Sequence, residues 1–340
     1  MKGLTEMLRA LTTGLIFAMG VMLTHHGAAG AVGTPTYPCF RAPQPPVIDG
    51  VIEGDAAWDA VPGVSGFYVL GGGYTIAKQT TAFACYDDEH LYVAMLCEEP
   101  DIDLVKSVMK DSDDLWTEDS VEVFVEPVVG GLVYQFAVSA GGATRGAEAA
   151  TGLAGWEAAA HKGEETYGIE MRLPFAAFEA APPAAQTFCV AFCRNIWTYA
   201  SGGDKFTSWP ALSRRFREPT SFAKLNFHPA TPTTAQRQQA ETVLNAGYRE
   251  HLMRQVVALA PAAAEYMPVL KLAAADEDSK LREEAREVIR QWRRVERLAS
   301  SASEAPLKRL REAAGRASAL THVSYELKYR YLLEQLLRDI

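Results

Sequence analysis

The sequence lacks the short motifs that mark the common enzyme active sites. It contains no G-x-S-x-G nucleophile turn, no H-E-x-x-H zinc motif, no P-loop and no G-x-G-x-x-G dinucleotide motif. Histidine is scarce, and two of the seven histidines fall within the first 31 residues. Glycoside hydrolysis needs two carboxylates across a cleft, whereas Glu118, Asp119 and Glu122 fall on a regular strand pattern. We therefore predict that the protein is not an enzyme.

Cysteine is also scarce, and long hydrophobic runs are absent after the N-terminus. The five cysteines match no zinc-binding spacing, and their odd number leaves at least one thiol unpaired within the chain. Residues 1–31 combine Lys2 and Arg9 with an apolar run and an Ala-Gly-Ala ending, which predicts a cleaved signal peptide. An uncleaved membrane anchor is the alternative, although the run is short for a span. We expect a secreted protein, periplasmic or extracellular, without a stable membrane span after cleavage.

Basic residues are under-represented between residues 34 and 234. This stretch holds 13 lysines and arginines against 26 aspartates and glutamates, whereas residues 235–340 hold 18 against 15. Nucleic acid requires a basic binding surface, so we exclude it as a partner of the acidic stretch. Neutral ligands and bound calcium suit such a domain better.

Short runs of alternating hydrophobic residues, separated by turn residues, occupy residues 47–227. The runs that predict strands are 80–86 with 91–97 as one hairpin, 121–126 with 132–139 as a second hairpin, and 167–173, 188–197 and 223–227. Residues 34–46 are rich in proline and predict an extended lead-in. This spacing is typical of an antiparallel β-sandwich of the immunoglobulin or jelly-roll type, and we place it at residues 34–230.

From about residue 231 the hydrophobic period changes to that of an α-helix. Glycine and proline become rarer, and apolar residues recur at helical spacing, most clearly over Lys280–Ala299. We therefore expect a mainly β protein with a second, α-helical domain over residues 231–340.

The stretch Asp113–Pro127, DDLWTEDSVEVFVEP, is the most informative about function. It runs from an acidic loop through Trp116 into an alternating strand, whose side chains should sort onto two faces. One face would carry Val121, Val123 and Val125, and the other would carry Glu122. An aromatic ring beside a fixed carboxylate can hold a sugar, because the ring packs on its apolar face and the acid bonds its hydroxyls.

Gln135 is a candidate for the same site. If the second hairpin pairs Val123 with Tyr134, Glu122 falls opposite Gln135 on the other face of the strands. Directly paired Cβ atoms lie about 4.5–5.5 Å apart, so the two side chains could share one ligand.

Six motifs in order over residues 43–227 resemble the family 9 carbohydrate-binding modules and their wider relatives. These are VIDGVIEGDAAW (47–58), DDEHLYVAMLCEEPDI (87–102), W-x-x-D-x-V-E (116–122), YGIEMRLPFAAF (167–178), RNIW (194–197) and SWPALSRRFREPTSFAKLNF (208–227). The resemblance implies a β-sandwich that binds a sugar without cleaving it, in support of polysaccharide breakdown. A shallow slot would favour a glycan end or an oligosaccharide.

The resemblance also implies roles for particular residues. In that family the ligand sits between two tryptophans, which correspond here to Trp116 and Trp209, and a glutamate, which corresponds to Glu122. Arg145 would be the basic member of the site. Trp58 and Trp156 are predicted to be core aromatics, while Trp197 fits either the core or the site.

Structural calcium is common in that family and prefers six to eight oxygen ligands. Asp49, Asp55 and Asp119 are the candidate donors, with ordinary turn aspartates as the alternative interpretation.

Two other functions remain open at this point. Similar sandwiches bind haem in cytochrome-like relatives, and Met95 and Met171 lie on predicted strands, but no strand histidine accompanies them as a second axial ligand. Alternatively, the protein is a scaffold whose helical tail, residues 231–340 with Trp292, binds a protein partner.

Overall fold

The computed structural model describes residues 34–75, 77–111, 113–147, 155–178, 187–198, 205–258, 260–300 and 305–338. The signal peptide predicted at residues 1–31 lies outside them. From Thr36 onward the chain forms one compact unit. Of the helices described, none combines the length and the apolar character that a membrane span requires.

Strands make up the first part of this unit. They are β1 (Thr36–Arg41), β2 (Tyr68–Val69), β3 (Thr80–Tyr86), β4 (His90–Glu98), β5 (Ser120–Glu126), β6 (Tyr134–Ser139), β7 (Thr144–Ala147), β8 (Glu157–Lys162), β9 (Thr166–Pro174), β10 (Thr187–Asn195), β11 (Phe206–Trp209) and β12 (Ala223–His228). Short helical turns lie between them: α2 (Ala56–Asp59), η1 (Ile102–Leu104), η2 (Leu115–Thr117), η3 (Phe175–Phe178) and η4 (Pro219–Ser221). The strands predicted from alternation are confirmed as β3, β4, β5, β6, β9, β10 and β12.

The sheet is mixed and not purely antiparallel as predicted. Its strand order is β7-β6-β5-β10-β12-β1-β3-β4-β9-β8, with β11 and β2 extending from β10. β1 runs parallel to both of its neighbours, β12 and β3. The difference arises in the proline-rich lead-in, where Tyr37 and Cys39 are buried and Thr36–Arg41 forms a strand that joins the two halves of the sheet.

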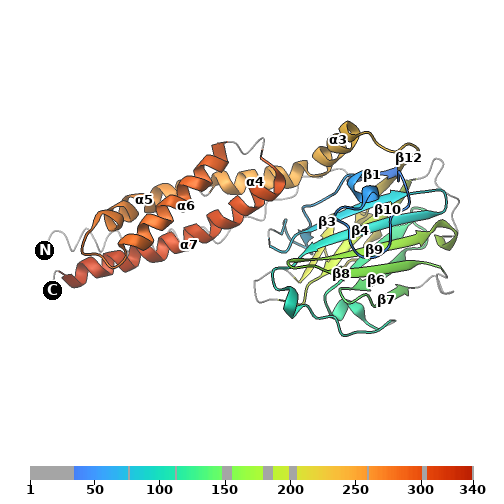
Figure 1. Cartoon of the computed structure of the whole chain (residues 1–340), viewed down its shortest axis with the longest axis horizontal. Helices are drawn as coiled ribbons and strands as arrows, with labels where there is room; N and C mark the ends of the chain where they lie inside the picture. The colour runs from blue at the N-terminus through green and yellow to red at the C-terminus, as the bar shows by residue number, and fades with distance from the viewer. Residues whose placement is uncertain are drawn as a thin grey trace. The chain divides into compact units, whose positions relative to one another are not determined.

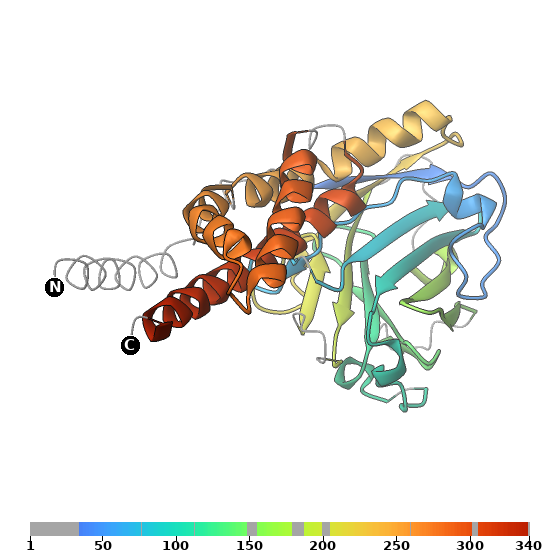
Figure 2. The ribbon, with the colours of Figure 1, turned by 60° about the vertical axis from the view of Figure 1, so that its left-hand side comes forward.

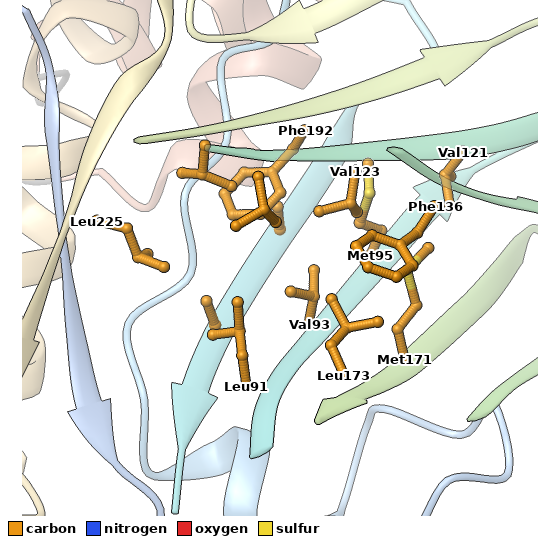
Figure 3. Close-up of a cluster of buried hydrophobic side chains, with 14 of the residues drawn as sticks. Leu91, Val93, Met95, Val121, Val123, Phe136, Met171, Leu173, Phe192 and Leu225 are labelled. Atoms are coloured by element: carbon orange, nitrogen blue, oxygen red, sulfur yellow. The ribbon is translucent and has the colours of Figure 1, made fainter. Parts of the chain in front are cut away.

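The sheet curls so that β6 and β8, distant in strand order, contact each other and one face encloses the core (Figure 1). Figure 3 shows side chains of β4 and β9 gathered with those of β5 and β10 in this core. Val121, Val123 and Val125 are buried there, which confirms the predicted sorting of β5. Met95 and Met171 also pack in this core, so neither supports the haem alternative.

Both tryptophans predicted to be core aromatics pack against the sheet. Trp58 is 2% exposed, and its Nε1 donates a hydrogen bond of 2.5 Å to Glu170 Oε1. Trp156 is half-buried and meets Phe136 edge to face, with ring centres 5.3 Å apart. The five cysteines lie in the described part of the chain, and each is buried and unpaired.

Five helices follow the last strand within the described residues: α3 (Thr234–Leu244), α4 (Ala246–Ala258), α5 (Ala260–Ala275), α6 (Arg282–Ser300) and α7 (Leu307–Arg338). α4, α5, α6 and α7 pack alongside one another (Figures 1 and 2). The limits of α6 lie within two residues of those predicted. Trp292 is 1% exposed and donates a 2.9 Å hydrogen bond to Ser324 Oγ, so it stabilises the bundle and offers no surface to a partner.

The helical part contacts the sandwich through the start of α4. Asn245 Nδ2 donates to Gly63 O at 2.9 Å, and its Oδ1 accepts from Ser65 N at 2.8 Å. Gly66 has a φ of +78°, and a Cβ at this position would lie 2.5 Å from the Cβ of Tyr248. Only glycine accommodates both the backbone conformation and the close approach of Tyr248.

Candidate functional site

A buried carboxylate held by two amides lies on the outer face of β5, β6 and β10. Glu122 is 4% exposed. Its Oε2 accepts a hydrogen bond of 2.5 Å from Gln135 Nε2, and its Oε1 accepts one of 2.8 Å from Asn195 Nδ2. Burial raises the pKa of Glu122, while both amides and the charge of Arg145 act in the opposite direction. The carboxylate is therefore fixed in one orientation.

Glu122 and Gln135 meet across a strand register that differs from the predicted one. Gln135 pairs with Phe124 and not with Glu122, and Val123 pairs with Phe136. The shift of two residues keeps every side chain on its predicted face, because side chains alternate with a period of two. Gln135 reaches Glu122 along the diagonal of the ladder, a separation that long side chains can span.

Trp116 and Arg145 form a second part of the group. Trp116 lies half-buried in η2, directly before β5, and Arg145 lies on β7. The Arg145 guanidinium lies 4.7 Å from the centre of the Trp116 ring. Its Nη1 also donates to Asp114 Oδ1 at 2.7 Å and to Asp113 O at 3.0 Å. Arg145 therefore ties the turn that carries Trp116 to the sheet.

Trp197, which the sequence left between core and site, joins Trp116. Its indole Nε1 donates to Trp116 O at 2.9 Å, and its backbone N donates to Asp119 Oδ1 at 3.0 Å. The ring is half-buried, and Lys205 Nζ lies 3.3 Å from its centre. The structure thus brings a second tryptophan to the group.

Trp209 does not join this group, and its predicted role as the second tryptophan is corrected. It is 5% exposed and lies in the hydrophobic core. Its ring stacks on Phe192 at 5.9 Å and meets Tyr37 edge to face at 6.2 Å. The reason is strand pairing: Trp209 on β11 lies opposite Phe192 on β10, whose side chain points inward, and paired residues share a face.

The alternation of side chains along β10 is a sequence signal for the position of Asn195 and Trp197. Along β10 the inward positions are the large residues Phe188, Val190 and Phe192. Asn195 is an odd number of residues from these positions and therefore points to the outer face of the sheet, as does Trp197 if the alternation continues past the end of β10. The alternation along β10 thus predicts that Asn195 lies on the same face of the sheet as Glu122.

Asp119 organises the loops around the site. It is fully buried, and its Oδ2 accepts hydrogen bonds from Lys106 N at 2.9 Å and from Thr198 Oγ1 at 3.0 Å. Its Oδ1 is bonded to the backbone of Trp197. Asp119 therefore has three protein donors.

Asp49 and Asp55 belong to the turns that surround α2. Asp49 Oδ1 accepts from Val51 N at 2.8 Å, and Asp55 Oδ1 caps α2 by accepting from Ala57 N at 2.7 Å. Among the residues described, no three histidine, cysteine or acidic side chains gather as a metal site requires. Asp49, Asp55 and Asp119 thus accept hydrogen bonds within turns, a helix cap and the loops of the site, and calcium binding at these residues stays a prediction.

The sequence matches the carbohydrate family 9 binding domain-like family over residues 48–228. The chain belongs to this family. The match confirms the resemblance carried by the six motifs, and it spans Trp116, Glu122, Gln135, Arg145, Asn195 and Trp197. The helices from Thr234 onward lie outside the family 9 match.

Three solved structures are similar to part of the chain. Two are of a family 9 carbohydrate-binding module from Caldicellulosiruptor kristjanssonii, in complex with glucose (15% identity, 58% of this chain and 98% of that one, TM-score 0.46) and with cellotriose (14%, 58% and 96%, 0.43). The third is a candidate carbohydrate-binding protein from Bacteroides uniformis (15%, 58% and 100%, 0.46). A comparison with curated proteins found no match.

Proposed function

We propose that this protein binds a carbohydrate, without cleaving it, at the surface formed by Trp116, Trp197 and Arg145, next to the buried polar side chains of Glu122 and Asn195. The observation that carries the proposal is that Arg145 connects two half-buried indoles with a buried, amide-held carboxylate, because it lies over the Trp116 ring and its charge acts on Glu122. A sugar ring has apolar C–H faces and polar hydroxyls, so it needs aromatic surface and directed hydrogen bonds together. Family 9 membership supports the same class of ligand.

The hydrogen-bonding groups of the site are suited to hydroxyls, which both donate and accept. Asn195 Oδ1 is buried and has no hydrogen-bond partner among the described residues. A buried acceptor in this state costs free energy unless a ligand or water donates to it. Asn195 is 0% exposed, so a sugar hydroxyl would reach its Oδ1 through a bridging water, whereas the cations beside the indoles, Lys205 and Arg145, would donate to hydroxyls directly.

The carboxylates around the site are engaged in ways that favour binding over hydrolysis. Both oxygens of Glu122 accept amide hydrogen bonds. Glu118 Oε2 accepts from two backbone N–H groups, and Asp119 accepts from three donors. Hydrolysis uses two carboxylates that flank the scissile bond, whereas these three acids accept hydrogen bonds within the protein. We infer a non-catalytic module that recognises glycan ends or oligosaccharides, acts outside the cytoplasm, and supports a separate hydrolase.

The direct test is Trp116→Ala in affinity electrophoresis through gels that contain soluble polysaccharides. We expect the retardation of the wild type to be lost while the melting temperature stays nearly unchanged, because Trp116 is only half-buried. Trp156→Ala is a matched control, since Trp156 is also half-buried but packs on the hydrophobic core. Unchanged retardation of Trp116→Ala, or its unfolding, would refute the assignment.

A further inference from the structure

Lys78 is a buried cation in an unusual backbone conformation. It is 4% exposed and has a φ of +47°, the only positive φ of a non-glycine residue in the described part of the chain. Such a conformation is uncommon for a residue with a Cβ. Strained residues persist where their surroundings hold them, and they are concentrated at functional sites. The side-chain contacts of Lys78 show which groups hold it in this backbone conformation.

The ammonium group of Lys78 meets three acceptors. Its Nζ lies 2.7 Å from Glu99 Oε1 and 3.2 Å from Asp101 Oδ2, and it donates to the backbone oxygen of Thr198 at 2.6 Å. An ammonium has three N–H donors, so these acceptors match its full capacity. Thr198 is the residue that follows Trp197.

Arg194 contacts the same cluster and begins the segment that ends at Thr198. Its side chain is fully buried, its Nη1 donates to Lys78 O at 2.8 Å, and its Nη2 lies 3.3 Å from Glu99 Oε2. The two cations Lys78 and Arg194 face the two carboxylates of Glu99 and the partly exposed Asp101, so the charges of this cluster sum to zero. Asn195, Ile196 and Trp197 thus lie between two anchors, the Arg194 side chain and the Thr198 carbonyl.

We propose that Lys78 is a positioning residue for the sugar-binding surface: by holding Thr198 O it sets the orientation of Trp197 and the end of β10. The inference rests on the proposed function. It adds a residue that contacts no sugar and lies far from the site in sequence. The path is short and direct, since Thr198 also donates to Asp119, which accepts from the backbone of Trp197.

The test removes the bond to Thr198 without leaving an unbalanced buried charge. Lys78→Met alone would leave two carboxylates facing one guanidinium, and an uncompensated buried charge is strongly destabilising. The double variant Lys78→Met/Glu99→Gln removes one charge of each sign. Lys78→Arg is the second variant, because it keeps the positive charge but replaces the ammonium, which meets three acceptors, with a planar guanidinium. Glu170→Gln is the control: its buried carboxylate accepts from Trp58, Asp49 and Gly50, none of which belongs to the site.

The readouts are the ¹⁹F NMR spectrum of 5-fluorotryptophan-labelled protein, assigned with Trp→Phe variants, and the glycan Kd from calorimetry. In Lys78→Met/Glu99→Gln and in Lys78→Arg we expect the Trp197 resonance to shift or broaden, the Trp58 and Trp292 resonances to stay in place, and Kd to rise about tenfold, or ~1.4 kcal/mol. Glu170→Gln should lower the melting temperature and leave Trp197 and Kd unchanged. The Trp197 resonance is read without sugar. A wild type that binds no glycan therefore refutes the proposed function alone, whereas an unmoved Trp197 resonance in both folded variants overturns the role of Lys78.

Discussion

Replacing Trp197 by alanine separates the two candidates for the second tryptophan. The indole is half-buried, and its Nε1 makes one neutral hydrogen bond to Trp116 O. If a sugar ring covers roughly 80 Å² of this indole, burial at ~25 cal/mol per Å² contributes about 2 kcal/mol to binding. Loss of that contribution raises Kd about thirtyfold, since ~1.4 kcal/mol corresponds to a factor of ten. The lost hydrogen bond lowers stability by only ~1 kcal/mol.

Trp209→Ala should behave in the opposite way. Trp209 is 5% exposed and packed between Phe192 and Tyr37, so its truncation leaves a core cavity. Such a change costs about 3–5 kcal/mol of unfolding free energy. At a temperature where the variant is still folded, its glycan affinity should stay within a factor of a few of the wild type. Urea denaturation and isothermal titration calorimetry on both variants provide the comparison.

The reasoning is refuted by the reverse pattern. The reverse pattern is that Trp209→Ala remains as stable as the wild type and loses glycan binding, while Trp197→Ala keeps it. In that case the family pattern read from the sequence, with Trp116 and Trp209, would be right.

Two further predictions concern stability. Burial raises the pKa of Glu122, so the folded state holds this proton more tightly than the unfolded state does. Relative to Glu122→Gln, the wild type should therefore be most stable below the ordinary pKa of glutamate and should lose stability as the pH rises through the raised pKa of the folded state. Urea titrations of both proteins across this pH range measure the difference in unfolding free energy. A difference that stays constant with pH would show that the carboxyl is not perturbed. Gly66→Ala places a Cβ 2.5 Å from the Cβ of Tyr248 at a φ of +78°. We expect this substitution to lower the free energy of unfolding by about 1–3 kcal/mol and to leave the glycan affinity unchanged. An unaltered melting temperature would contradict the close approach of α4.

The sequence predicted the strands that alternate strongly, because burial of one face imposes a period of two. It missed β1, since the prolines around Thr36–Arg41 are typical of extended lead-ins and the segment becomes a strand only by pairing with β12 and β3. Parallel pairing of this kind is set by the tertiary fold and leaves no local signal. The same limit explains why a mixed sheet was read as an antiparallel one.

The site was predictable in part for related reasons. Alternation determines the face on which Glu122 and Gln135 lie, but it does not determine the register, which is shifted by two residues. Trp197 ends the predicted strand 188–197, whereas Trp209 lies in no predicted strand, and only the pairing of Trp209 with Phe192 shows that Trp209 points inward. Lys78 could not be found from the sequence, because its partners Glu99, Asp101 and Thr198 come together only in the folded chain.

The central claim is that the two indoles and the buried carboxylate form a carbohydrate-binding surface. A glycan array probed side by side with the wild type and Trp116→Ala/Trp197→Ala tests it most directly. We predict that the wild type binds a defined set of glycans and that the folded double variant binds none of them. A wild type that binds no glycan, or a double variant with the same binding profile, would contradict the claim.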